Sequence, residues 1–245
     1  MLEAEVKNEV LKEVINVIST LVDEAKFALA EDGITLKVVD PAHVAMAEIS
    51  LSEKAFESFK AKEGELGIDI NKLSDVLKLA KAGDIIKILH DEEKNSLIVK
   101  ISNITRRMQL VDTSSLSDPK VPNLSLPVKL TLEAGDLSQG IRASESVSDH
   151  ISLTVTPEGF ELSSKGDTDL VNLKLPKDLL KSIECAESVK SMFSLSYFAN
   201  MIKAVSPTGD VTLAMGTDYP IMMEFQLAEG NGTVKYLLAP RIEGD

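Results

Sequence analysis

The pattern of apolar and polar positions repeats about halfway along the chain. Residues 31–40, EDGITLKVVD, begin with residues typical of a turn, Glu31 to Gly33, and apolar and polar residues then alternate from Ile34. Residues 157–164, PEGFELSS, have the same order, and their glycine, Gly159, lies 126 residues after Gly33. Alternation with a period of two is typical of a strand with one buried face. The pattern predicts an equivalent turn and strand in each half.

A segment with the apolar spacing of a helix precedes the strand in each half, and the two segments are also 126 residues apart. The segment LKEVINVISTLV, which begins at Leu11, has apolar residues at three- and four-residue intervals, the period of one helix face. Leu137 lies 126 residues later and opens LSQGIRASESV. After the turn and strand, each half has a second alternating strand, at 44–51 and at 169–175.

A second helix follows in each half. Residues 68–84, IDINKLSDVLKLAKAGD, match residues 193–210, FSLSYFANMIKAVSPTGD, in their apolar positions and in their final Gly-Asp. Asn71 and Ser196 stand where helix N-caps are expected. Further alternating strands then end each half, IIKIL and SLIVKI in the first and VTLAM and IMMEFQL in the second.

The repeat predicts an α+β chain made of two similar domains. Residues 112–127, DTSSLSDPKVPNLSLP, contain three prolines and no helical period, which is typical of an extended connection. We therefore expect a first domain at 1–112, a linker at 113–128 and a second domain at 129–245. The period of about half the chain is too long for a solenoid, whose repeats run roughly 20–50 residues.

Basic residues recur on the polar side of the predicted helices. Five positions after the first apolar anchor of each helix, about 140° around its axis, stand Asn16, Lys78, Arg142 and Lys203. Lys12, Lys72 and Lys81 lie nearby. A solvated helix face explains this pattern as well as a phosphate-binding surface does, and Glu9 and Glu13 share the polar side of the first helix. The pattern alone leaves both interpretations open.

Composition limits the class of protein. The chain has 245 residues, 44% of them hydrophobic, and a net charge of −13, which by itself argues against nucleic-acid binding. No apolar run approaches the roughly 18 residues that a membrane span needs. The N-terminus lacks the features of a signal peptide, and the single cysteine, Cys185, is typical of a reducing compartment. We expect an intracellular protein.

Two stretches in particular identify a family resemblance. Residues 11–51, with the D-x-x-H-V sequence from Asp40 to Val44, and the ending KYLLAPRIEGD at 235–245 resemble the proliferating cell nuclear antigen (PCNA) family of DNA sliding clamps, of the archaeal type. The resemblance extends from end to end. It implies a tandem duplicated clamp fold in which three chains close a pseudo-sixfold ring, with helices inside, sheets outside and duplex DNA in the hole.

The resemblance implies roles for named residues. The DNA-facing residues would be Lys12, Asn16, Lys72, Lys78, Lys81, Arg142 and Lys203. The last strand of the first domain, 106–112, would pair with 169–175 of the next chain through Arg106, Arg107, Met108, Leu110, Leu170, Asn172, Leu173 and Leu175. Ion pairs at this junction would join Arg106, Arg107 or Lys81 to Glu145 or Asp149.

The resemblance also implies partner proteins. Members bind a short motif, the PIP box, in a pocket beneath the linker, and a clamp loader, DNA polymerase, flap nuclease and ligase would bind there. The matching residues are Val39, His43, Val44, Val121, Pro122, Tyr219, Pro220, Leu238, Ala239, Pro240 and Ile242. Such a clamp would be cytoplasmic and nucleoid-associated in an archaeon, or nuclear in a eukaryote.

No pattern of catalytic residues accompanies these features. His43, His90 and His150 are scattered without metal-ligand spacing, and no P-loop, G-x-S-x-G or G-x-G-x-x-G sequence occurs. We expect no enzyme activity, cofactor or metal. Asp91, Glu92 and Glu93 are expected in a solvated hairpin turn. Two alternatives stay open: an enzyme with a site assembled from separated residues, and a protein-only scaffold, of which a checkpoint-type clamp relative is a narrower variant.

Overall fold

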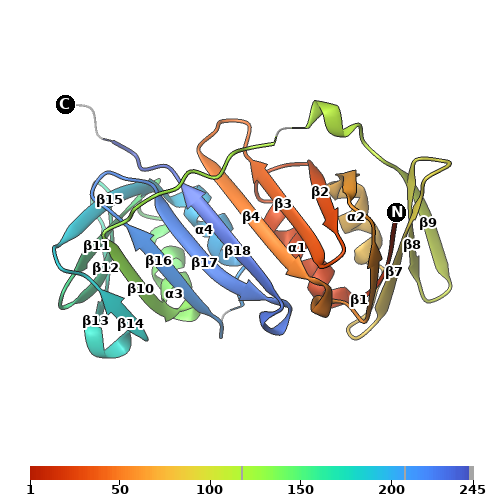
Figure 1. Cartoon of the computed structure of the whole chain (residues 1–245). Helices are drawn as coiled ribbons and strands as arrows, with labels where there is room; N and C mark the ends of the chain where they lie inside the picture. The colour runs from red at the N-terminus through yellow and green to blue at the C-terminus, as the bar shows by residue number, and fades with distance from the viewer. Residues whose placement is uncertain (117, 207, 243–245) are drawn as a thin grey trace. The chain divides into compact units, whose positions relative to one another are not determined.

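The chain forms two compact units of mixed helix and sheet. In the computed structural model, which describes residues 1–116, 118–206 and 208–242, unit 1 comprises Met1–Val121 with Gln226–Val234, and unit 2 comprises Pro122–Phe225 with the chain from Lys235 onward (Figure 1). The division falls inside the expected linker. Ser117 of that linker, Pro207 beside the fourth predicted helix and residues 243–245 of the tail lie outside the described residues.

Unit 1 contains two sheets and two helices. One sheet has the strand order β5-β1-β7-β8-β9, and the other strands follow the order β4-β3-β2-β6. The elements are β1 (Leu2–Lys7), α1 (Asn8–Ile18), β2 (Glu24–Ala30), β3 (Gly33–Val39), β4 (Ala45–Ser52), β5 (Ser58–Ala61), β6 (Gly64–Asp69), α2 (Ile70–Leu77), β7 (Ile85–Asp91), β8 (Ser96–Ile101) and β9 (Ile104–Gln109).

Unit 2 has the same construction. Its sheets have the strand orders β14-β10-β16-β17-β18 and β13-β12-β11-β15. The elements are β10 (Val128–Glu133), α3 (Ala134–Ser144), β11 (His150–Thr156), β12 (Gly159–Lys165), β13 (Leu170–Pro176), β14 (Ser182–Glu184), β15 (Val189–Ser194), α4 (Leu195–Lys203), β16 (Asp210–Met215), β17 (Ile221–Leu227) and β18 (Gly232–Leu238). The tip of the β17–β18 hairpin groups with unit 1, where the Asn231 carbonyl accepts from the Ser52 amide at 3.0 Å.

The duplication predicted from the sequence is confirmed element by element. β1 begins at residue 2 and β10 at residue 128, α1 at 8 and α3 at 134, and β3 at 33 and β12 at 159, an offset of 126 each time. The order of strands within each pair of sheets is also the same. The chain therefore has the α+β, two-module fold that its repeat predicts.

The two glycines that opened the repeat have one structural reason. Gly33 and Gly159 begin equivalent strands with φ of +156° and +153°. A Cβ on Gly33 would lie 2.1 Å from the Leu51 carbonyl oxygen, and a Cβ on Gly159 would lie 2.3 Å from that of Leu175. Only glycine leaves room for the neighbouring strand at this turn, so both modules carry the same requirement.

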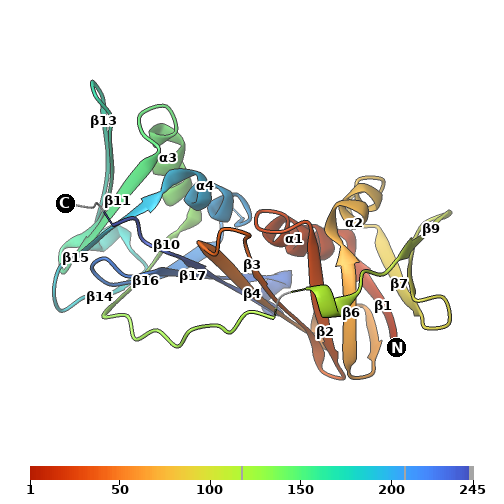
Figure 2. The same cartoon turned by 90° about the horizontal axis from the view of Figure 1, so that it is seen from above.

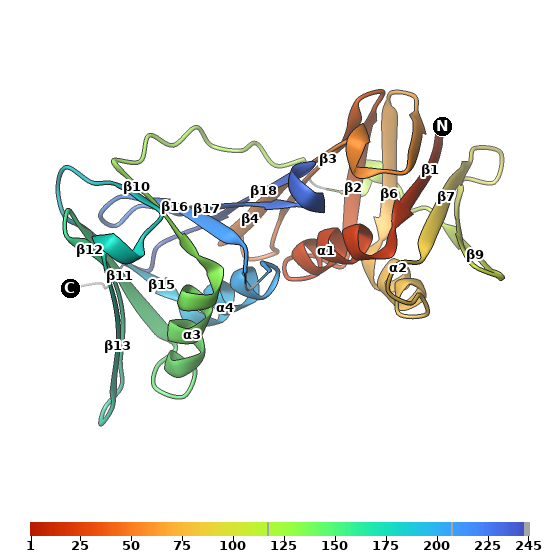
Figure 3. The ribbon, with the colours of Figure 1, turned by 90° about the horizontal axis from the view of Figure 1, so that it is seen from below.

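In each unit the helices pack side by side over the sheets. α1 contacts α2 and the strands β1 and β4, while α3 contacts α4 and the strands β10 and β13 (Figure 2, Figure 3). The predicted apolar anchors Leu11, Leu73, Leu137 and Phe198 are all buried. Each helix therefore contributes one apolar stripe to its unit's core, as its periodicity predicts.

Several predicted boundaries need correction. α1 begins at Asn8, three residues before the first predicted anchor, and Asn8 is buried with its amide donating to the Lys81 carbonyl at 3.2 Å. Neither predicted cap residue is a cap. Asp69 caps α2 by accepting from the Lys72 amide, and Ser194 occupies the N-cap position of α4 without a side-chain bond. The strand expected at 106–112 is Ile104–Gln109, and the strand expected at 169–175 is Leu170–Pro176.

Candidate nucleic-acid interface and partner surfaces

The predicted DNA-facing residues of unit 1 lie on the solvent side of its helices. Asn16 on α1, Lys72 on α2, Lys78 at the end of α2 and Lys81 in the following turn are exposed, and Lys12 on α1 is half-buried. The five-residue step from each buried anchor therefore reaches solvent as predicted. These side chains share a surface because α1 packs against α2.

Unit 2 carries the equivalent residues. Arg142 on α3 and Lys203 at the end of α4 are exposed, and α3 packs against α4. The end of α4 borders a hollow of about 470 Å³, whose lining includes Glu145, Asp149, His150, Lys203 and Arg241. The basic surface of this unit is thus mixed with acidic side chains.

Three of these six cations, Lys72, Lys78 and Lys203, have an acidic partner on their own chain. Lys72 Nζ lies 2.8 Å from Asp69 Oδ2, Lys78 Nζ lies 2.8 Å from Asp75 Oδ1, and Lys203 Nζ lies 3.9 Å from Glu145 Oε1. The hydrogen bond from Lys78 holds the pKa of Asp75 below its ordinary value. Exposed pairs of this kind are weak. A phosphate could therefore replace the carboxylate as the partner of each lysine, but the ion pair within the chain would first have to break.

The strand β9 has one paired and one unpaired edge within the described residues. It stands last in its sheet and pairs with β8, Met108 opposite Leu97. The Leu110 amide donates to the Asn95 carbonyl at 3.1 Å. Since alternate residues of an antiparallel strand bond the same neighbour, the amides of Met108 and Arg106 point toward β8, while those of Thr105, Arg107 and Gln109 point to the outer edge.

Side chains of β9 divide between the two faces of the sheet. Met108 is 6% exposed and packs in the core of unit 1, so it could join a subunit interface through its backbone only. Arg106 is half-buried on the same face as Met108, on the side where its charge also lowers the pKa of Asp75. Leu110 is half-buried just beyond the strand.

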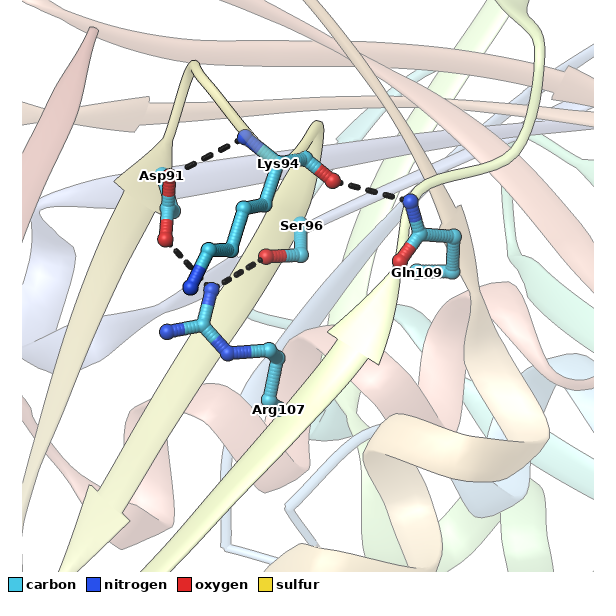
Figure 4. A network of polar contacts seen from close by, with 5 residues as sticks. All are labelled: Asp91, Lys94, Ser96, Arg107 and Gln109. Atoms are coloured by element: carbon cyan, nitrogen blue, oxygen red, sulfur yellow. Dashed lines mark hydrogen bonds and ion pairs between the residues drawn. The ribbon is translucent and has the colours of Figure 1, made fainter.

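Arg107 takes part in a polar network at the β7–β8 turn (Figure 4). Its guanidinium pairs with Asp91 and donates to Ser96 Oγ at 2.8 Å. The Lys94 amide donates to Asp91 Oδ1 at 3.1 Å, and Gln109 Nε2 donates to the Lys94 carbonyl at 2.8 Å. The Arg107 hydrogen bond holds the pKa of Asp91 below its ordinary value. The expectation that Asp91 is merely solvated was wrong, and Arg107 has a partner within its own unit.

The strand β13 has the corresponding arrangement in unit 2. It stands last in its sheet and pairs with β12, Leu175 opposite Phe160. The Lys177 amide donates to the Glu158 carbonyl at 2.9 Å, so the amides of Leu170, Asn172 and Lys174 point to the outer edge.

The predicted interface side chains of β13 also divide by face. Leu170 is 67% exposed, whereas Leu175 is 5% exposed and belongs to its own core. Leu173 is half-buried and packs on α3, where a Cβ added to Gly140 would lie 2.8 Å from Leu173 Cδ2. Asn172 is exposed and donates to Glu161 Oε1 at 2.9 Å.

The predicted partner residues of unit 1 surround a tight loop after β3. Asp40 is 4% exposed, and its carboxylate accepts from the amides of Val44 at 2.8 Å and Ala45 at 2.6 Å. His43 has a φ of +57° and is exposed, while Val44 and the preceding Val39 are half-buried. The D-x-x-H-V sequence therefore encodes a loop that Asp40 holds in shape. Val121 is half-buried at the end of the unit.

The predicted partner residues of unit 2 lie near its tail. Tyr219 is 56% and Ile242 70% exposed, Pro122 is exposed, and Pro220, Ala239 and Pro240 are half-buried, whereas Leu238 is buried. The Arg241 amide donates to the Met192 carbonyl at 2.7 Å. A hollow of about 320 Å³ adjoins Ile242 and is also lined by Lys190, Met192 and Asp218, which the sequence did not indicate because β15 and the tail meet only in the fold.

Other candidate chemistry is sparse in the described part of the chain. Residues 1–116, 118–206 and 208–242 contain no group of three or more His, Cys, Asp or Glu side chains arranged to hold a metal ion. Burial lowers the pKa of His90 and raises that of Cys185. Over the same residues, every helix is too short or too polar to cross a bilayer.

Comparison with known proteins identifies the two halves separately. The family model described as proliferating cell nuclear antigen, N-terminal domain, matches residues 1–117, and that of the C-terminal domain matches residues 120–241. A protein of Methanocella arvoryzae named DNA polymerase sliding clamp is 41% identical over 246 residues, and one of Methanosarcina mazei is 39% identical; each alignment covers 100% of both chains.

Solved structures agree with this assignment. A structure described as the C-terminal region of FEN-1 bound to A. fulgidus PCNA has a TM-score of 0.95 and 31% identity, with 100% of both chains covered. PCNA from Thermococcus kodakaraensis has a TM-score of 0.92 and 24% identity, covering 98% of this chain and 100% of that one. The latter likeness shows the fold alone.

Proposed function

The chain belongs to the proliferating cell nuclear antigen family, and from this premise we propose that it is a DNA polymerase sliding clamp without catalytic activity of its own. Three chains would close a ring around duplex DNA and hold a polymerase there. The observation that carries the proposal is the full-length match to sliding clamps by a chain that repeats one module twice. Such a protein acts inside the cell, next to the nucleoid in an archaeon.

Ring closure would occur between the outer edges of β9 and β13. The outward amides of Thr105, Arg107 and Gln109 on one chain would pair with β13 of the next, whose outward amides belong to Leu170, Asn172 and Lys174. This pairing is supported by the position of both strands at the end of their sheets. Closing a ring removes the unpaired edges that otherwise favour aggregation.

DNA would contact the helices through weak, exchangeable ion pairs. The residues that would face the phosphates, three copies of each in the ring, are Lys12, Asn16, Lys72, Lys78, Lys81, Arg142 and Lys203. Sequence-independent contacts to phosphates fix no register, which is what sliding requires. The existing pairs Lys72–Asp69, Lys78–Asp75 and Lys203–Glu145 support a weak hold, since each lysine has an alternative partner.

A triple substitution tests the DNA surface. We expect Lys78→Ala, Arg142→Ala and Lys203→Ala together to reduce clamp-dependent stimulation of a DNA polymerase at low salt and to flatten its salt dependence, because fewer counterions are released. All three residues are exposed, so the fold should persist. The matched control is Lys54→Ala, Lys100→Ala and Lys177→Ala, which removes the same charge from exposed positions outside the four α-helices. Equal stimulation by both triple variants would contradict the assignment.

Partner enzymes would bind through PIP-box peptides beside the linker. We propose that the clamp loader, polymerase, flap nuclease and ligase use this surface. The contributing residues of unit 1 would be Val39, His43, Val44 and Val121, and those of unit 2 would be Pro122, Tyr219, Pro220, Ala239, Pro240 and Ile242. Leu238 is left out because its side chain is buried. The relative whose structure is described as bound to the C-terminal region of FEN-1 supports the proposal.

The exposed tail residue gives a direct test of the partner surface. Ile242→Ala removes an apolar side chain that is 70% exposed, so it should not affect the fold. We expect it to weaken PIP-box peptide binding by about 1 kcal/mol, the lower range of an interface contact, in a calorimetric titration. Unchanged affinity would exclude Ile242 from the surface.

A further inference from the structure

Lys26 is a lysine on the outer face of a sheet that is nevertheless largely covered. It occupies the centre of β2, where the core side chains Ala25, Phe27 and Leu29 point to the opposite face. Its own side chain is 14% exposed. A charged side chain at this burial needs nearby groups that compensate its lost hydration.

Two carboxylates supply that compensation. Lys26 Nζ lies 3.3 Å from Glu65 Oε1 and 3.5 Å from Asp118 Oδ2. Glu65 belongs to β6, which pairs with β2 so that Gly67 stands opposite Lys26. Glu65 is therefore a diagonal neighbour within the sheet. Asp118 comes from a different element, because it lies in the segment that connects the two units.

The connecting segment reaches Lys26 by a defined path. The Val111 amide donates to the Gly67 carbonyl at 2.8 Å, and a Cβ on Gly67 would lie 2.3 Å from the Val111 oxygen. Asp112 then accepts from the Ser114 amide at 3.0 Å and folds the turn Thr113–Ser115. The start of the connection thus pairs with Gly67 as a neighbouring strand would, at the position that stands opposite Lys26.

The two carboxylates differ in what happens when the connection moves. Glu65 stays beside Lys26 because both belong to the same sheet, so the lysine keeps one compensating charge. Asp118 is 70% exposed and can regain full hydration. The Lys26–Asp118 contact can therefore break and form again at small cost, whereas a buried lysine with a single partner would resist release.

We infer that Lys26 is a positioning residue for partner binding, which holds the first part of the connection between the units on unit 1 through Asp118. This inference rests on the proposed binding of PIP-box peptides beside the linker. A linker that is already ordered loses less conformational entropy when a peptide binds against it. Breaking the contact should therefore loosen the linker and weaken peptide binding together.

Hydrogen exchange of the linker amides measures the first effect. We expect Asp118→Asn and Lys26→Met each to speed exchange at Val111–Leu116 several-fold at low salt, and raised salt to do the same to the parent by screening the pair. The double variant should exchange as fast as the single variants, because each single variant already removes the Lys26–Asp118 contact. Lys120→Gln, an exposed charge change in the same linker, should leave exchange unchanged. Parent-like exchange in Asp118→Asn would overturn the inference even if Lys26→Met proved unstable.

Peptide affinity measures the second effect. In titrations with a PIP-box peptide, Asp118→Asn and Lys26→Met should raise the dissociation constant roughly 3- to 10-fold, equivalent to about 0.6–1.4 kcal/mol, and Lys120→Gln should not. Faster linker exchange with unchanged affinity would refute the positioning role. A parent protein that does not bind the peptide at all would refute the proposed function instead, and the exchange result distinguishes the two failures.

Discussion

The basic side chains on the helices are balanced by acidic residues at the scale of single contacts. Lys78 and Asp75 are exposed and separated by three positions on α2, with 2.8 Å between Nζ and Oδ1. A phosphate that binds Lys78 competes with this carboxylate and is also repelled by it. The acidic residue would therefore reduce the affinity for DNA while the lysine stays in place, which suits a protein whose proposed role is to move along its ligand.

Asp75→Asn tests this balance. We expect the variant to bind duplex DNA more tightly and to have a steeper dependence of log K on log salt, by roughly 0.9 for each additional phosphate that the protein neutralises and so by up to about 3 in a trimer. Fluorescence anisotropy of a labelled duplex across a salt series would measure both. Asp178→Asn makes the same charge change at an exposed position of unit 2 outside the α-helices and should change neither quantity. Identical salt slopes for the two variants would show that Asp75 does not compete for Lys78.

The edge strands are the elements on which assembly depends. β9 and β13 carry buried side chains on one face, Met108 and Leu175, and outward backbone donors along one edge. Their contribution to a ring would come mainly from the backbone. A proline at Met108 would not test the outer edge of β9, because the Met108 amide points toward β8 and its side chain is in the core.

Arg107 allows the backbone contribution to be isolated. Arg107→Pro removes an outward amide and the side chain, whereas Arg107→Ala removes only the side chain and its contacts with Asp91 and Ser96. Proline is tolerated on an edge strand when its missing amide faces outward. We expect the alanine variant to remain a trimer and the proline variant to run as monomer in light scattering, with the circular dichroism of a folded chain. A trimeric proline variant would exclude this edge from the interface.

At the scale of elements, the sequence predicted most of the fold and less of the sites. The period-two and helical patterns predicted where the strands and helices lie, because in both kinds of element the burial of one face determines which positions are apolar. The cap at Asp69 was missed because Asn71, two residues later, is an equally good cap residue by type. Lys26 pairs with Asp118, 92 positions later, and Arg107 pairs with Asp91, 16 positions earlier. No local sequence pattern connects such residues before the sheets form.

The whole molecule is explained by one module used twice. The equivalent glycines, helices and strand orders of the two units mean that three chains would present six similar modules around an axis. Three chains of 26.6 kDa give about 80 kDa, which light scattering of the purified protein would report if the homotrimer forms. A ring would also explain how a protein of net charge −13 could stay on DNA, since a closed ring needs little affinity for the duplex that it encircles.

Retention on circular DNA tests the account most directly, because only a closed ring is held by topology. The protein would be loaded by an ATP-driven clamp loader onto nicked circular DNA, and the DNA-bound fraction measured by gel filtration before and after a restriction enzyme linearises the circle. We predict that the protein stays on the circle at a salt concentration that abolishes ordinary phosphate binding and is lost after linearisation. Loss from the intact circle at that salt, or equal retention on circular and linear DNA, would contradict the sliding-clamp account.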